Sequence, residues 1–134
     1  MKKMLILTLI GFVLTAAVPA CAQTVDNRYI QIAEIEIDPA QLEAYKAAVK
    51  EQIDTAVRVE PGVLMLYAVT ETDNPTRVRV FEVYRDAAAY RSHLEAPHFK
   101  KYKSTTATMV KSLKLVVTKP VALESKPVGS ASAQ

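Results

Sequence analysis

The sequence contains two histidines, His93 and His98, both in the second half of the chain. Imidazole is the only side chain whose unperturbed pKa lies near neutrality, so these residues are candidates for proton transfer at physiological pH. His93 could instead serve a helix cap or the edge of the core. Because His98 directly follows Pro97, holding a helix junction is the more common role for it.

Two tyrosines in expected strands, Tyr67 and Tyr84, could each place a hydroxyl group on the aromatic wall of a pocket. Ordinary packing within a sheet is the alternative role for both. The sequence has no zinc-ligand spacing, no nucleophile elbow and, with only three glycines, no glycine-rich phosphate loop. The residues therefore indicate acid–base or binding chemistry rather than metal or phosphate chemistry.

Four strands and their connecting helices must position these residues. Apolar patterns predict strands over 29–37, 63–70, 77–85 and 113–118. A helix is expected after the first strand, and two helical segments, 86–94 and 97–112, are expected before the last. The order strand, helix, strand, strand, helix, strand predicts an α+β fold of the ferredoxin-like (βαββαβ) type, an antiparallel sheet with helices on one face.

The first helix has start and stop signals of its own. Asp38 can cap its free amides, Pro39 suits the first turn, and Gln41 can complete a capping box. Pro61 and Gly62 end it, because proline cannot continue a helix and glycine allows a turn.

The strand over 63–70 is apolar on both faces, which indicates that both faces are covered. The helices of the domain supply one cover. The other must come from a different surface, reached through outward-facing residues such as Leu64 or Leu66.

The N-terminus predicts export. Two lysines precede an uncharged apolar run over 4–18 and then small residues, which is the order of a secretory signal peptide. We expect cleavage after residue 22, giving a periplasmic or cell-envelope protein. Alternatively, residues 18–21 form a lipobox, in which case residues 1–20 are removed and Cys21 is lipidated, attaching the product to the membrane.

The remaining chain is divided into a domain over 28–119 and a flexible tail over 120–134, which is rich in Ser, Ala, Pro and Lys. Of the formal net charge of +3, two charges come from Lys2 and Lys3 in the predicted signal peptide. The nearly neutral product argues against nucleic acid as a partner, because phosphate binding requires a basic surface.

Three segments resemble the antibiotic biosynthesis monooxygenase family, which includes quinol monooxygenases. They are Glu60-Pro61-Gly62 leading into a strand, Phe81-Glu82-Val83-Tyr84-Arg85-Asp86, and the segment from His93 to Lys100. The resemblance covers about residues 28–119. It implies a homodimer, the dimeric α/β barrel, in which the open faces of two sheets pack together, and a pocket between sheet and helices in each subunit.

Members of this family with known activity oxidise quinols and similar electron-rich aromatics with O2 and no metal or flavin. The resemblance implies the same reaction and no cofactor for this chain, with His93, at the position of a helix histidine in the family motif, as the catalytic residue. It implies Tyr67, Tyr84 and His98 as substrate-binding residues. The alternative is a non-enzymatic dimeric binding protein for a small hydrophobic molecule.

The haem-degrading branch of the superfamily is disfavoured. It uses a Trp at the position of Tyr84 and a haem-ligating His near Lys103, whereas this chain has no Trp at all.

Overall fold

The computed structural model describes residues 26–124. The predicted signal peptide, its alternative lipidation site at Cys21, and residues 125–134 of the predicted tail lie outside the described residues. Within residues 26–124, no helix is long and apolar enough to cross a membrane.

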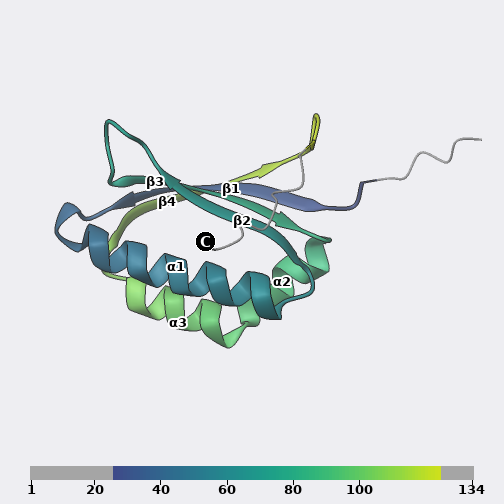
Figure 1. Cartoon of the computed structure of the whole chain (residues 1–134), viewed down its shortest axis with the longest axis horizontal. Helices are drawn as coiled ribbons and strands as arrows, with labels where there is room; N and C mark the ends of the chain where they lie inside the picture. Colours follow the sequence, from purple (N-terminus) through teal and green to yellow (C-terminus); the bar gives the residue numbers. More distant parts are fainter. Residues whose placement is uncertain (1–25, 125–134) are drawn as a thin grey trace, which may run out of the picture.

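The described chain forms one antiparallel sheet covered on one face by helices (Figure 1). The strands are β1 (Tyr29–Ile37), β2 (Val63–Thr70), β3 (Arg77–Tyr84) and β4 (Val110–Thr118), in the spatial order β2-β3-β1-β4. The helices are a 3₁₀ turn (Pro39–Gln41), α1 (Leu42–Val59), α2 (Ala87–Glu95) and α3 (Pro97–Thr106). The predicted ferredoxin-like α+β fold is confirmed.

The start of the first helix differs from the capping box that was expected. The Asp38 side chain accepts a hydrogen bond from the Ala40 amide at 2.9 Å, as predicted for a cap. Gln41 does not complete the box; its side-chain amide donates to the Thr108 carbonyl instead. The expected local contact is thus replaced by one that ties the helix start to the turn before β4.

The last strand begins three residues earlier than the alternation of Leu113, Leu115 and Val117 predicted, and α3 ends at Thr106 instead of near residue 112. Val110 pairs with Ile37 across a bulge in the β1–β4 ladder. The Met109 amide donates to the Thr106 carbonyl, closing the turn. Residues 110–112 therefore pair with β1 instead of continuing the helix. The sequence pattern does not predict this part of the strand, because Lys111 and Ser112 are polar and interrupt the apolar alternation.

Residue 62 must be a glycine because there is no room for a side chain at this position. The described residues contain no positive φ angle, so the turn itself does not demand glycine. A Cβ atom added at Gly62 would lie 2.5 Å from the Cβ of Ala89 on α2, far inside van der Waals contact. The Gly62 carbonyl also accepts from the Arg85 amide, so this close approach joins the start of β2 to the end of β3.

The strand register shows which residues lie side by side on each face of the sheet. On the helix-facing side, one row across the sheet consists of Leu66, Glu82, Gln31 and Val117. On the outer side, the next row consists of Tyr67, Phe81, Ile32 and Val116. Leu66 is therefore part of the core, and it cannot be the outward-facing residue that was considered from the sequence.

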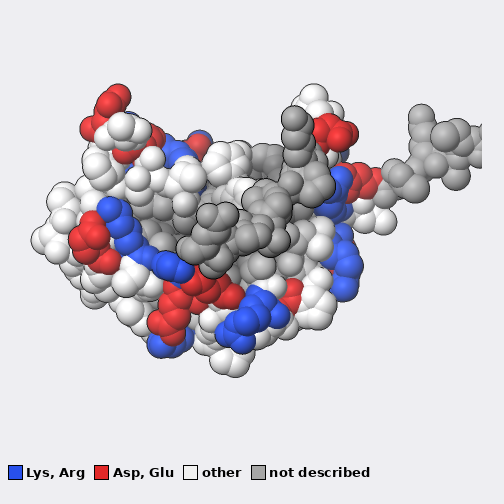
Figure 2. All heavy atoms as spheres, in the orientation of Figure 1, with Lys and Arg blue, Asp and Glu red and all other residues white. Residues whose placement is uncertain are grey.

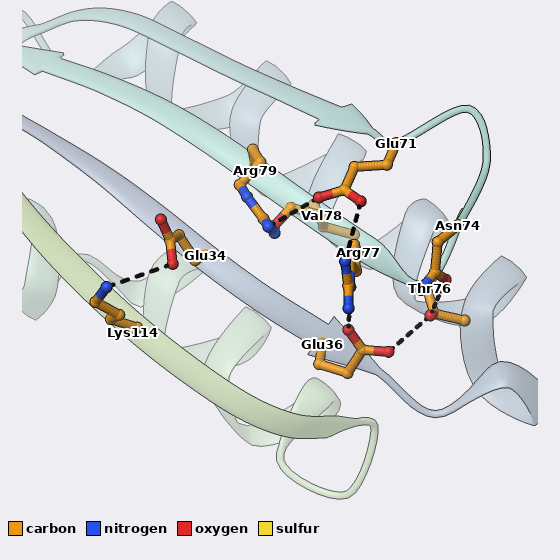
Figure 3. Close-up of polar contacts among 9 residues, drawn as sticks. All are labelled: Glu34, Glu36, Glu71, Asn74, Thr76, Arg77, Val78, Arg79 and Lys114. Carbon is orange, nitrogen blue, oxygen red and sulfur yellow. Dashed lines mark hydrogen bonds and ion pairs between the residues drawn. The ribbon is translucent and has the colours of Figure 1, made fainter.

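The charged residues of the outer face gather at one end of the sheet (Figure 3). Arg79 pairs with Glu71 at 2.8 Å, and Lys114 lies 3.8 Å from Glu34 on the neighbouring strand. The helix surface seen in Figure 2 carries acidic and basic residues intermixed, with pairs such as Lys101 and Glu51. Such exposed pairs contribute little to stability.

Candidate functional site

A cavity of about 290 Å³ lies between the sheet and its helices. All four strands and all three α-helices contribute to its walls, which are mainly aliphatic and aromatic. The polar groups that line it include Gln31, Gln52, Glu82, Tyr84 and His93. A mainly apolar hollow with a few convergent polar groups is the usual form of a small-molecule site.

Glu82 is a carboxylate held on the buried face of β3. Its Oε2 atom accepts a hydrogen bond from the Tyr84 hydroxyl at 2.7 Å and another from the Gln31 amide at 2.8 Å. Burial raises the pKa of Glu82 above its ordinary value of 4.5, and the two hydrogen bonds and nearby His93 oppose this rise. The cavity therefore holds an acid–base group that is more basic than a carboxylate in water.

Tyr84 supports this carboxylate from the same strand. The side chain is fully buried, and its ring centroid lies 5.4 Å from that of His93. Burial, and then the charge of Glu82, raise the pKa of the Tyr84 hydroxyl. The hydroxyl therefore stays protonated and acts as a hydrogen-bond donor.

His93 is only 2% exposed and has partners on both ring nitrogens. Its Nδ1 lies 2.7 Å from Glu60 Oε1, and its Nε2 lies 3.2 Å from the Gln52 side-chain amide nitrogen. A carboxylate can only accept and an amide nitrogen can only donate, so these partners assign the proton to Nδ1. In this arrangement Nδ1 donates to Glu60 and Nε2 accepts from Gln52.

Glu60 joins the two histidines. The same Oε1 atom accepts from His98 Nε2 at 2.6 Å, so one carboxylate oxygen bridges both rings. The ligand atoms of Glu60, His93 and His98 lie within 4.8 Å of one another, which makes them a group that could hold a metal ion. In the present geometry, a metal would have to replace both hydrogen bonds to Glu60.

The structure brings two of the four sequence-predicted site residues together. His93 and Tyr84 both line the cavity, whereas His98 lies behind Glu60 and does not line it. Tyr67 is 59% exposed and belongs to a separate, more open groove between β2 and α1. The reason is a bulge between Val63 and Met65, which shifts the alternation of β2 by one residue and turns Tyr67 away from His93.

Sequence reasoning missed Glu82, Gln31 and Gln52 as site residues. A signal for Glu82 was present, because it lies two residues before Tyr84 and two after Val80, both buried positions of the same strand. Period-two alternation alone places its carboxylate on the helix-facing side. Gln52 falls between apolar positions of α1. Its role as a hydrogen-bond partner of His93 can be seen only once α2 is packed against α1.

These features define a class: a ferredoxin-like α+β domain with a small-molecule cavity, containing acid–base groups, between sheet and helices. Comparison with known proteins narrows the class. The family model for antibiotic biosynthesis monooxygenases matches residues 28–105, and the chain belongs to this family.

Solved structures agree with this assignment. One from Bacteroides thetaiotaomicron, described as a candidate antibiotic biosynthesis monooxygenase, is 47% identical, with a TM-score of 0.73 and coverage of 75% of this chain and 97% of that chain. A candidate monooxygenase from Lactobacillus acidophilus is 34% identical, with a TM-score of 0.68, and the match covers 69% of this chain but 44% of that one. A third, from Nitrosomonas europaea, shares the fold at 24% identity, with a TM-score of 0.68 and coverage of 72% and 92%. No curated protein matches the chain.

Proposed function

We propose that the protein is a monooxygenase that oxidises a quinol, or a similar electron-rich aromatic, with O2 and without metal or flavin. The observation that carries the proposal is the mainly apolar cavity with a half-buried carboxylate and a buried histidine on its walls. Family membership and the monooxygenase names of its relatives support the reaction class. A volume of about 290 Å³ is at the small end of ligand sites and suits one or two rings.

The reaction balances without an added reductant. A quinol and O2 give a hydroxyquinone and one water molecule, and the substrate supplies all the electrons. Triplet O2 reacts slowly with a neutral phenol and faster with an electron-rich anion, so the protein has to remove a proton and exclude water. In this proposal His93 and Tyr84 contact the substrate. His98 contributes indirectly, because it hydrogen-bonds to Glu60, which in turn holds His93.

The protein acts as a homodimer in the cell envelope in this proposal. The outer row of Tyr67, Phe81, Ile32 and Val116 is apolar and lies on the sheet face without helices, which suits packing against the same face of a second copy. Export rests on the N-terminal signal pattern alone. Mass spectrometry of the purified envelope protein tests it, with a chain beginning at Gln23 or at a lipidated Cys21 expected and an intact Met1 opposing it.

Oxygen uptake by metal-free protein tests the activity. We expect O2 consumption that is proportional to protein concentration with at least one reduced quinone or anthrone, together with the hydroxylated product. Heat-denatured protein controls for autoxidation of the substrate. If a broad panel of quinols gives only the rate of the denatured control, the proposal is wrong.

The second candidate is a binding protein for a small hydrophobic molecule. One observation favours it: both nitrogens of His93 are already engaged within the protein, leaving neither free for a substrate. An aromatic ligand that raises the melting temperature without any O2 consumption would select this role.

A further inference from the structure

We infer that Glu82 is the group that accepts the substrate proton, and that the cavity selects an un-ionised aromatic alcohol whose hydroxyl points at β3. The inference rests on the proposed function for the reaction, but its recognition step can be tested without turnover.

The two oxygens of Glu82 have different surroundings. Both hydrogen bonds, from Tyr84 and Gln31, end on Oε2, and no described residue donates to Oε1. Among residues 26–124, no buried side-chain nitrogen or oxygen lacks a hydrogen-bond partner. Oε1, which has no partner, is therefore not fully buried, and because Glu82 lines the cavity, this oxygen can accept a hydrogen bond from a bound molecule.

His93 is less suited to the same task. To take a proton at Nε2, it would first have to lose the hydrogen bond from Gln52, and its Nδ1 already donates to Glu60. Glu82 needs no such rearrangement, because its two donors fix the carboxylate on one side and leave the other side free. Tyr84 and Gln31 thus act as positioning residues for Glu82.

The proton balance is simple. The substrate hydroxyl and the Glu82 carboxylate become a phenolate and a neutral carboxylic acid, so the charge inside the cavity stays constant. The pKa of Glu82, raised by burial, reduces the free-energy cost of this transfer compared with a carboxylate in water. The phenolate is then the electron-rich species that reacts with O2.

The charges around the cavity also restrict the substrate. The titratable groups that face Glu82 are Tyr84, Tyr29, Tyr45, Tyr102 and His93. None of them is a permanent cation, and the lysine that lines the cavity, Lys103, is exposed. A carboxylate or sulfonate placed beside Glu82 would be repelled without compensation. A neutral phenol or quinol is the class that fits.

Glu82→Gln is the decisive variant for turnover. Its side-chain carbonyl can still accept from Tyr84 and Gln31, and its amide takes the position of Oε1, so the shape is kept while the base is lost. We expect O2 uptake to fall by a factor on the order of 10² to 10⁴. Glu43→Gln, which removes an exposed helix carboxylate, is the control and should retain the wild-type rate.

Tyr84→Phe gives a second signature, which a merely structural role would not produce. The Tyr84 hydrogen bond lowers the pKa of Glu82, so its removal should raise that pKa further. Because Glu82 must be ionised to accept a proton, the acidic limb of the kcat/KM profile should move to higher pH. A profile that keeps its acidic limb in place would argue against Glu82 as the base.

Binding of a probe that is not turned over separates this inference from the proposed function. Without O2, the wild-type protein should bind 2-naphthol about tenfold to a hundredfold more tightly than 2-methoxynaphthalene, because only the alcohol can donate to Oε1. Glu82→Gln should lose this preference, since its amide can donate equally to both oxygens.

The outcomes are distinct. An active wild type whose rate Glu82→Gln leaves within about threefold, or a naphthol preference that survives in that variant, overturns the role of Glu82. An inactive wild type with a preference that depends on Glu82 overturns the oxygenase proposal and supports the recognition of an aromatic alcohol.

Discussion

The two faces of the sheet are both rich in apolar side chains, but they place their polar residues differently. On the helix-facing side, Glu82 and Gln31 lie opposite each other in the middle of the sheet, where helices enclose them. On the outer side, the charged residues gather at one end (Figure 3). The row that contains Tyr67 and Phe81 carries no charge. The first arrangement can surround a small molecule, whereas the second can be covered only by another surface.

This difference results from alternation and from one bulge. Along β1 and β3, successive residues point to opposite faces, so Gln31 and Glu82 face the helices while Ile32 and Phe81 face outward. The bulge near Val63 brings β2 into the same pattern, with Leu66 inward and Tyr67 outward. The two faces can therefore be tested by substitutions that differ little except in direction.

Phe81→Lys should have the largest effect on assembly. Phe81 is 41% exposed at the centre of the outer row, and a dimer would bury its replacement as an unpaired charge. We expect the dimer dissociation constant, measured by sedimentation, to rise by a factor on the order of 10³.

Leu113→Lys is the matched control for the opposite face. Leu113 is 44% exposed but lies on the helix-facing side of β4, at the cavity wall. This variant should remain dimeric and bind aromatic ligands more weakly, whereas Phe81→Lys should keep the cavity. Dissociation of both variants, or of neither, would contradict the division of the sheet into a binding face and a pairing face.

His93→Ala should destabilise the folded state by about 1–3 kcal/mol, because it removes one partner from each of two polar groups, Glu60 and Gln52. Denaturant unfolding at fixed protein concentration measures this loss. His98→Ala is the comparison: its side chain is more exposed, so water can replace it beside Glu60, and the loss should be smaller. An equal loss of unfolding free energy in both variants would show that the deeper burial of His93 does not increase its contribution to stability.

The sequence predicts much of the fold because the fold depends on local patterns. Asp86 caps α2 and Pro97 opens α3 in the structure, as their positions indicated. The site is less predictable, because its contacts join residues far apart in the chain, such as Gln52 with His93 and Gln31 with Glu82. A one-residue bulge in β2 turns Tyr67 away from the cavity, and no sequence pattern in β2 predicts this bulge.

The smallest expected effect concerns the pH dependence of stability. Burial raises the pKa of Glu82 in the folded protein above its ordinary value of 4.5. Below that value Glu82 is protonated in both states, so ionisation favours neither. As the pH rises toward the folded pKa, the unfolded chain loses its proton first, which favours unfolding. Glu82 therefore makes wild-type stability fall with pH through this window, and above the folded pKa the loss is complete.

Glu82→Gln cannot ionise and should lack this loss. Its free energy of unfolding relative to wild type should increase from about pH 4.5 upward and then become constant, as measured by denaturant unfolding across the range. Glu43→Gln, which removes an exposed carboxylate from helix α1, is measured in parallel as the control for the loss of one negative charge. Parallel wild-type and Glu82→Gln curves would show that the cavity does not desolvate Glu82. A difference in unfolding free energy that rises with pH, together with lost turnover, would show that keeping a base inside the cavity destabilises the folded protein. The outer face holds no such group, so no comparable cost is expected there.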